Sequence, residues 1–335
     1  MADGLLFEIP LGDWAKSAVD WMTGNLKGVF DWISGDILMP LYTFLENFLL
    51  TPDFLSIAVI VTLAITLWKG WKAGLGGAGA FALAFILSQW FLTPPESVAD
   101  DLPVWTIMAL LTFVAFAVKG WKLAVGSLLG FLIIYGVGQW SNAMSSFALV
   151  LVASIIAIAI GIPLGILAAK SRTASAIVRP VLDFLQTMPA FVYLIPFVVL
   201  FRIGVVPGIV ATILFSIAPA VRFTELGIKQ VDREVVEAAH AFGAHPARIL
   251  AQIQLPLARQ NIMGGVNQVI MLALSMVVIA GMVGAGGLGA DVYTSVTQVN
   301  ISLGAESGLS VVILAMYLDR VTSAFGMSKR DQLTQ

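Results

Sequence analysis

The sequence predicts an all-α, polytopic helical membrane protein, and three observations support this fold class. Of the 335 residues, 59% are hydrophobic and only 11% are charged, and the mean hydropathy is +0.94. Apolar runs of helical-span length recur along the chain, and no stretch reads convincingly as a β-strand. A soluble domain of this length would carry many more charges, so the composition indicates a chain that crosses a membrane several times.

Residues 1–53 form an acidic, amphipathic leader. They contain eight Asp and Glu residues against only Lys16 and Lys27, and the charges interrupt the aromatic and aliphatic residues every few positions. No part stays apolar for the roughly 20 residues that a helical span needs. We therefore expect helices that lie in the membrane interface. The basic start and apolar run of a secretory signal are missing, so no cleavage is expected.

Nine candidate spans follow the leader. They lie at about 54–68, 74–92, 103–118, 123–140, 144–169, 181–201, 205–221, 262–282 and 306–325.

Residues 54–140 contain a duplicated helical hairpin. Lys-Gly-Trp-Lys occurs at 69–72 and again at 119–122, and Gln-Trp occurs at 89–90 and 139–140. Both pairs are 50 residues apart, which indicates two copies of one unit. Each copy should be two helices joined by a tight basic turn, with a tryptophan anchor at the opposite interface.

The basic residues predict the orientation. If the nine spans alternate and the polar segment around residue 240 is cytoplasmic, only Lys16, Lys27 and Arg202 lie outside. The other 15 of the 18 Lys and Arg residues are then cytoplasmic. We expect an extracytoplasmic N-terminus and a cytoplasmic C-terminus, with residues 327–335 as a cytoplasmic tail.

Residues 223–261 are the one long polar segment, set within a core domain at 141–326. Asp232 should cap a short helix, and Gly243 should end it as a C′ residue with positive φ. A second short helix should run over 246–255, where Pro256 closes it. The apolar stripe of the first helix consists of Val235, Val236, Ala239 and Phe242.

Within this segment, residues 237–256 (EAAHAFGAHPARILAQIQLP) resemble the coupling loop of ATP-binding-cassette (ABC) importer permeases. That signature reads Glu-Ala-Ala, three residues, Gly, nine residues, Ile, one residue, Leu-Pro. It falls without a gap on Glu237, Ala238, Ala239, Gly243, Ile253, Leu255 and Pro256. The resemblance implies that the loop docks into a groove of a separate ATPase and transmits its closure as a rigid-body transition. The alternative is an ordinary amphipathic surface loop.

Longer local matches resemble the permease subunit of glycine betaine/proline (osmoprotectant) importers. They cover residues 142–326 and are clearest at 161–169, 179–196, 265–289 and 313–322. The leader is similar too, whereas the additional hairpin at about 54–102 departs from the pattern. The resemblance implies a type I ABC importer transmembrane fold.

Polar and aromatic residues in two spans are candidates for a translocation pathway. Pro189 and Pro196 each remove a helical hydrogen bond, so the span at 181–201 should be kinked. Aromatic faces beside the kink could contact a cationic head group. Packing between helices is the alternative interpretation. The candidate pathway residues are Gln186, Thr187, Phe191, Tyr193, Asn267 and Ser275.

The sequence gives no support for nucleotide binding, catalysis or metal binding by this chain. Gly284, Gly286 and Gly289 match G-x-G-x-x-G, but no strand is expected before them, so helix packing is the better interpretation. The chain has no P-loop motif, and its only histidines, His240 and His245, lie in the coupling segment. We expect no catalytic residue, no metal site, no nucleic-acid partner and no cofactor bound by this chain, with ATP bound by the partner ATPase.

The resemblance therefore implies a non-enzymatic, multi-pass permease of a bacterial plasma (inner) membrane. Its expected partners are two ABC ATPase subunits, an extracytoplasmic substrate-binding protein, a second copy of the permease and membrane lipid. The expected solutes are glycine betaine and proline-type osmoprotectants. The alternatives are the same architecture for choline, carnitine, taurine or methionine, or a secondary transporter that works alone.

Overall fold

The computed structural model describes residues 10–51 and 102–326, and all regular structure in these two ranges is helical. The N-terminal helices are α1 (Leu11–Asn25), α2 (Lys27–Trp32), the π-helix η1 (Ile33–Leu38) and α3 (Met39–Leu50). The hairpin and the first half of the core contain α7 (Leu102–Lys119), α8 (Trp121–Gly136), α9 (Trp140–Lys170), α10 (Arg172–Thr187), α11 (Ala190–Phe201) and α12 (Val205–Lys229). The second half contains α13 (Arg233–Ala241), α14 (Pro246–Ile249), the π-helix η2 (Leu250–Gln254), α15 (Leu255–Ser275), α16 (Val277–Met282), α17 (Gly287–Thr297) and α18 (Ile301–Gly326).

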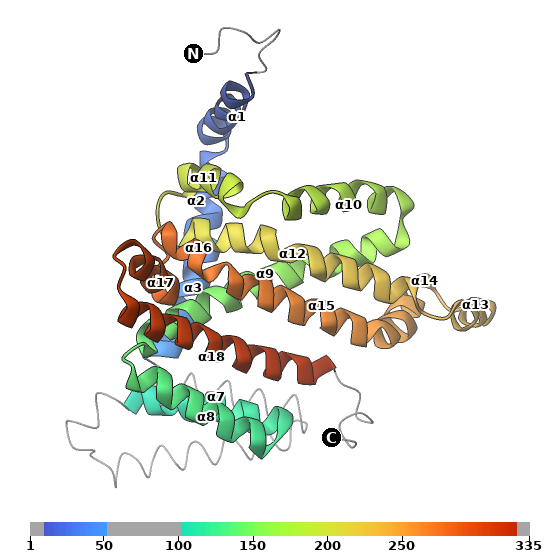
Figure 1. Cartoon of the computed structure of the whole chain (residues 1–335). Helices are drawn as coiled ribbons and strands as arrows, with labels where there is room; N and C mark the ends of the chain where they lie inside the picture. Colours follow the sequence, from blue (N-terminus) through green and yellow to red (C-terminus); the bar gives the residue numbers. More distant parts are fainter. Residues whose placement is uncertain (1–9, 52–101, 327–335) are drawn as a thin grey trace.

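Four long apolar helical stretches make up the body of the protein. They are Trp140–Lys170, Val205–Lys229, Pro246–Met282 and Ile301–Ala324, each long and apolar enough to cross a membrane. Helices α9, α12, α15 and α18 lie side by side, roughly parallel or antiparallel to one another (Figure 1). The chain is therefore a polytopic helical membrane protein, as predicted. The candidate spans at 54–68 and 74–92 lie outside the described residues.

Helices α9 and α12 form the tightest pair in this bundle. A Cβ added at Gly161 would lie 2.6 Å from Ala220 Cβ, and one added at Gly165 would lie 2.6 Å from the Val221 carbonyl oxygen. Small residues four apart let two helix backbones approach closely, which is how helices associate where no water drives them together. The pair is therefore a closely packed scaffold that holds the C-terminal end of α12.

The second of the two predicted hairpins is formed by α7 and α8. Gly120, within the second Lys-Gly-Trp-Lys turn, has φ +83° and separates the two helices. Both helices are shorter than the four long spans. Contrary to the prediction, Trp140 is not an interfacial anchor: it is buried, with its ring edge-on to Phe131 at 6.1 Å. The Lys-Gly-Trp-Lys turn at 69–72 lies outside the described residues.

The leader is helical over α1 to α3 and crosses the long helices at a steep angle (Figure 1). The aromatic side chains of Trp14, Trp21 and Trp32 are exposed, whereas Tyr42 and Leu49 of α3 are buried against the bundle. Helix α3 packs on α9. This crosswise course fits helices that lie along a membrane surface, with α3 packed against the body of the protein from its first turn to its last.

The apolar run at 181–201 bends at Pro189, as predicted, but much more sharply than an ordinary proline kink. It is divided between α10 and α11, whose axes differ by 96°. Met188 and Pro189 have extended backbone angles between the two helices, while Pro196 is accommodated inside α11. The residue before a proline avoids helical angles, so the break falls at Met188. Helix α10 also begins before the apolar run. It starts at Arg172, so the more polar residues 172–180 belong to the same helix.

Helices α16 and α17 fold back on each other at the end of the bundle where α9 and α12 begin (Figure 1). Glycines 284, 286 and 287 have positive φ in the turn between them. The Ser146 hydroxyl of α9 accepts a 2.8 Å hydrogen bond from the Leu288 N–H, and Asn142 donates to Asp291 at 2.6 Å. The glycine motif is therefore a packing turn between helices, as predicted, and it follows a helix and not a strand.

Candidate functional site

Helix α13 projects from the bundle at the end opposite α17 (Figure 1). Only Gln230, Val231 and Asp232 separate it from α12. The Asp232 carboxylate accepts a 2.9 Å hydrogen bond from the Glu234 N–H, so it is the predicted N-cap. No residue of α13 is buried. The short link keeps α13 close to the C-terminal end of α12.

Gly243 ends α13 with φ +77°, as predicted. Its N–H donates to the His240 carbonyl oxygen at 2.9 Å, and the N–H of Ala244 donates to the Ala239 carbonyl oxygen at 3.1 Å. These two bonds make a Schellman motif, which satisfies the last carbonyls of the helix. No atom lies within 4 Å of a Cβ built on Gly243, so the turn needs glycine for its backbone angles and not for space.

The second short helix of the prediction does not exist as a separate element. The His245 side chain caps α14, which then continues through the π-turn η2 into α15, so 246–282 is one long helical stretch. Pro256 does not close a helix but lies in the first turn of α15. We attribute this to η2, because a widened turn relieves the clash between a proline ring and the carbonyl four residues earlier.

The seven residues of the coupling signature lie in two parts of residues 230–256, which we call the α13 unit. Glu237, Ala238 and Ala239 are on α13, Gly243 is in the turn, and Ile253, Leu255 and Pro256 are where η2 meets α15. Helices α12 and α15 both extend into the polar segment, so the predicted loop at 223–261 is helical over most of its length. The coupling role of the seven residues remains a prediction.

The tip of the unit is more apolar than its polar composition suggests. The Phe242 side chain is 91% exposed, and Val235 is also exposed on α13. Glu237 does not reach the bundle but pairs with Arg233 on the same helix at 2.7 Å. Phe242 and Val235 therefore give α13 an exposed apolar surface.

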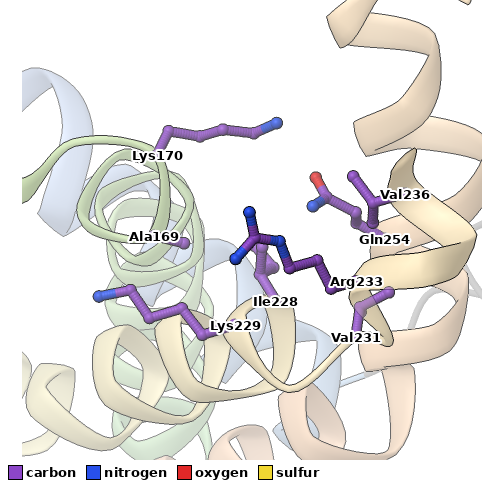
Figure 2. Close-up of a pocket in the computed structure, with 8 residues that line it drawn as sticks. All are labelled: Ala169, Lys170, Ile228, Lys229, Val231, Arg233, Val236 and Gln254. Atoms are coloured by element: carbon purple, nitrogen blue, oxygen red, sulfur yellow. The ribbon is translucent and has the colours of Figure 1, made fainter. Parts of the chain in front are cut away.

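A shallow pocket of about 230 Å³ lies between α13 and the C-terminal ends of α9 and α12 (Figure 2). Val236, from the predicted apolar stripe, lines it together with Ile228 and Ala169. Lys170, Lys229 and Arg233 surround the opening. The stripe is therefore divided, because Val236 faces the bundle whereas Val235 and Phe242 are exposed.

Beside this pocket lies a buried carboxylate that the sequence interpretation missed. Glu225 of α12 is only 2% exposed, and Lys229 donates to it at 2.5 Å. From α10, the Ser175 hydroxyl donates to Glu225 at 2.8 Å and Arg179 donates at 2.9 Å. The sequence did contain a signal for this cluster. Ser175 and Arg179 are four residues apart, as are Glu225 and Lys229, so each pair lies on one face of its helix.

The predicted pathway residues of α10 and α11 flank the break between these helices. Gln186 and Thr187 are the last residues of α10, and the Thr187 hydroxyl donates to its own helix at 3.2 Å. Phe191 is exposed, whereas Tyr193 is 6% exposed and packs with Leu194. The structure thus separates the two aromatic side chains, and of the pair Phe191 offers the open ring face.

The two candidates of α15 occupy different surroundings. Asn267 donates to Asp319 at 3.1 Å and accepts from Thr322 at 2.5 Å, so it joins α15 to α18. Ser275 donates within its own helix at 2.7 Å, and Met276 beside it packs in the same apolar cluster as Tyr193. Asn267 therefore links two helices, which was the alternative to a pathway role. Ser275 lies close to the α10–α11 break. Within residues 10–51 and 102–326, no group of three His, Cys, Asp or Glu side chains could hold a metal ion.

Comparisons with known proteins agree with this architecture. Residues 161–326 match the binding-protein-dependent transport system inner membrane component family. The glycine betaine transport system permease protein OpuAB of Bacillus subtilis is 48% identical over 326 residues, 97% of each chain. The glycine betaine/proline betaine permease protein ProW of Escherichia coli is 46% identical over 324 residues, 97% of this chain and 77% of ProW.

A further relative is the glycine betaine/carnitine transport permease protein GbuB of Listeria monocytogenes, 48% identical over 239 residues, 70% of this chain and 85% of GbuB. Among solved structures, an inward-facing MetNI methionine ABC transporter aligns with a TM-score of 0.50 and 23% identity, over 56% of this chain and 95% of the other. That likeness concerns the fold alone. The helical bundle, the projecting α13 unit and the relatives together show that the chain belongs to the binding-protein-dependent transport system inner membrane components, the permeases of ABC importers.

Proposed function

We propose that this chain is the membrane-spanning subunit of an ATP-driven importer of glycine betaine and related betaines. The observation that carries the proposal is the 48% identity to the glycine betaine permease OpuAB over 97% of both chains. ProW and GbuB, whose names also specify glycine betaine, support it. The chain would not hydrolyse ATP itself, since two partner ATPase subunits would bind and hydrolyse it.

The α13 unit is the proposed docking surface for those ATPase subunits. Its short link to α12, its closed Schellman end and the exposed Phe242 ring form a rigid projection with an apolar tip. Burial of such a ring contributes about 1.5–3 kcal/mol to binding. ATPase closure would then move α13 and α12 as one piece, which suits a rigid-body switch between two access states.

The proposed orientation follows from this docking surface. With α13 in the cytoplasm of a bacterium, the turn between α7 and α8 and the ends of α9, α12 and α18 lie on the same side (Figure 1). The inner-membrane protein would then have its N-terminus outside and its C-terminus inside. Helices α16 and α17 would face the substrate-binding protein, and a second permease copy would complete the pathway.

The α10–α11 break is the proposed position of the solute pathway. The open face of Phe191 and the polar end of α10 lie together there. Cation–π contacts of about 0.5–2 kcal/mol would guide a quaternary ammonium head without trapping it. The solute would be a compact zwitterion, with glycine betaine first and proline-type solutes second.

Competition for uptake tests the substrate. The permease would be reconstituted with its partner ATPase and binding protein, and entry of labelled glycine betaine would be measured. Excess proline betaine should compete, and excess methionine or taurine should not. If methionine blocked the transport and betaines had no effect, the substrate proposal would be wrong while the permease assignment would stand.

A further inference from the structure

Helix α10 has an unusual orientation for an amphipathic helix at the edge of a protein. Its apolar residues Ile177, Val181 and Phe184 are exposed, although they recur on one face. Its polar residues at 175, 179 and 183 recur every four positions on another face, and they bond to α12. The contact between α10 and α12 is therefore polar, whereas the outward face is apolar.

One half of this contact centres on the buried Glu225 carboxylate. It accepts hydrogen bonds from Ser175 and Arg179 of α10 and from Lys229 of its own helix. Arg179 also donates through Nε at 3.3 Å, so the guanidinium approaches both carboxylate oxygens. A carboxylate this buried is stable only while its partners remain in place, because an unpaired charge there is costly.

The other half is the ion pair between Asp183 of α10 and Arg222 of α12, both of which are exposed. The two helices run antiparallel, with Arg179 beside Glu225 and Asp183 beside Arg222. We call this contact the polar zipper. Its residues are Ser175, Arg179, Asp183, Arg222, Glu225 and Lys229.

The order of charges in the polar zipper fixes the register of the two helices. A slip of one helical turn, about 5.4 Å, towards the cytoplasmic end of α12 would place Arg179 beside Lys229 and Asp183 beside Glu225. A slip the other way would place Arg179 beside Arg222. Like charges then oppose each other in either direction, so only one register is electrostatically favourable.

The two ends of the polar zipper connect to the two functional regions. Lys229 is the last residue of α12 and is separated from α13 by three residues, and α10 ends at the break where α11 turns away by 96°. We propose that the polar zipper makes α10 and α12 one rigid lever that carries the movement of α13 to the α10–α11 break. This inference rests on the proposed function, because the movement would come from the partner ATPase.

Charge exchange at the exposed pair tests the lever without disturbing a buried group. In the reconstituted complex, Asp183→Arg should lower the solute imported per ATP hydrolysed several-fold, because the introduced guanidinium would repel that of Arg222. The double variant Asp183→Arg/Arg222→Asp should restore most of the ratio. Ile177→Ala is the matched control, since it alters the apolar face of α10 and should leave the ratio unchanged.

Cross-linking tests rigidity directly, and the natural chain contains no cysteine. Ser175→Cys/Glu225→Cys removes both the buried acid and a donor, and should uncouple hydrolysis from import. A short, reducible thiol cross-linker between the two cysteines should restore coupling, and reduction should abolish it again. If α10 and α12 had to slide past each other during transport, the cross-linked complex would be inactive, and the lever would be refuted.

The two proposals fail in different ways. If the unmodified complex imported no betaine, the proposed function would fail before any variant was made. If the unmodified complex transported normally and neither Asp183→Arg nor the cysteine pair changed the import per ATP, only the lever would be wrong. The amount of each variant in the membrane, and its co-purification with the ATPase, identify the variants that fail to fold. If the cysteine pair fails to fold, the charge exchange at Asp183 and Arg222 still tests the lever.

Discussion

The N–H of Ala244 donates a 3.1 Å hydrogen bond to the carbonyl oxygen of Ala239, which closes the end of the projecting helix α13. This bond is possible only because Gly243 between them has φ +77°. The closure holds the Phe242 ring at a fixed position at the tip of the unit. The geometry of the proposed docking surface thus depends on one backbone conformation.

Replacement of Gly243 by valine should uncouple transport while the permease remains in the membrane. A left-handed conformation costs an ordinary residue roughly 1–2 kcal/mol, and a β-branched residue more. The end of α13 should therefore fray, and betaine uptake should fall at least several-fold. Gly126→Val is the control, because Gly126 lies in α8 with an ordinary φ and nothing within 4 Å of an added Cβ. Wild-type uptake by Gly243→Val would show that the closed turn is not required.

Phe242→Ala should weaken ATPase binding. If the ring is buried on docking, its loss removes about 1.5–3 kcal/mol, which corresponds to an about 10- to 150-fold rise in Kd. Binding of the purified ATPase to the permease in detergent measures this. Ile203→Ala is the matched control, since Ile203 is 78% exposed but lies before α12, at the opposite end of the bundle. Equal affinities for both variants would contradict docking through α13.

Glu237→Ala should have a much smaller effect than Gly243→Val. Glu237 is exposed and pairs with Arg233 on its own helix, and such pairs contribute about 0–1 kcal/mol. Uptake within about fivefold of the unmodified protein is expected. A loss as large as that of Gly243→Val would mean that the carboxylate binds the ATPase directly.

Gly289→Ala should destabilise the permease without affecting any nucleotide site. An added Cβ would lie 2.0 Å from the Val277 carbonyl oxygen, so α16 and α17 would have to separate. Overpacking of this kind costs about 1–3 kcal/mol or more. The thermal unfolding temperature in detergent should fall, whereas Gly136→Ala, with nothing within 4 Å, should leave it unchanged. ATP binding by the isolated permease would contradict the packing interpretation of this glycine motif.

Reporter fusions test the orientation. A reporter that is active only in the cytoplasm should be silent when fused after Thr51 and active when fused after Arg320. The reason is the concentration of basic residues on the side of α13. Activity of the Thr51 fusion would place the leader in the cytoplasm and would require a different number of spans in residues 54–140.

The sequence predicted those features that depend on local rules. Apolar length indicated the long spans, Asp232 and Gly243 indicated the two ends of α13, and the repeated turn indicated the α7–α8 hairpin. Each of these follows from the preference of one residue or one short run. The coupling motif was recognisable because its spacing is fixed within a single segment.

The sequence predictions fell short where contacts with neighbouring elements determine where a helix ends, how sharply it bends and which side chains meet. Pro256 stops a helix in isolation, yet η2 accommodates it and α15 continues. The run at 181–201 has the length of a span, but Met188 and Pro189 break it almost at a right angle. The polar zipper was missed because Arg179 and Glu225 are 46 residues apart, and only the packing of α10 on α12 brings them together.

Omission of single components from the reconstituted complex is the most direct test of the account. Labelled glycine betaine entry into vesicles would be measured with the permease, its ATPase, its binding protein and ATP, and then with each left out in turn. The account predicts that uptake requires all four. Sustained, concentrative uptake by the permease alone, driven by an ion gradient and independent of ATP, would contradict it and would identify the chain as a secondary transporter.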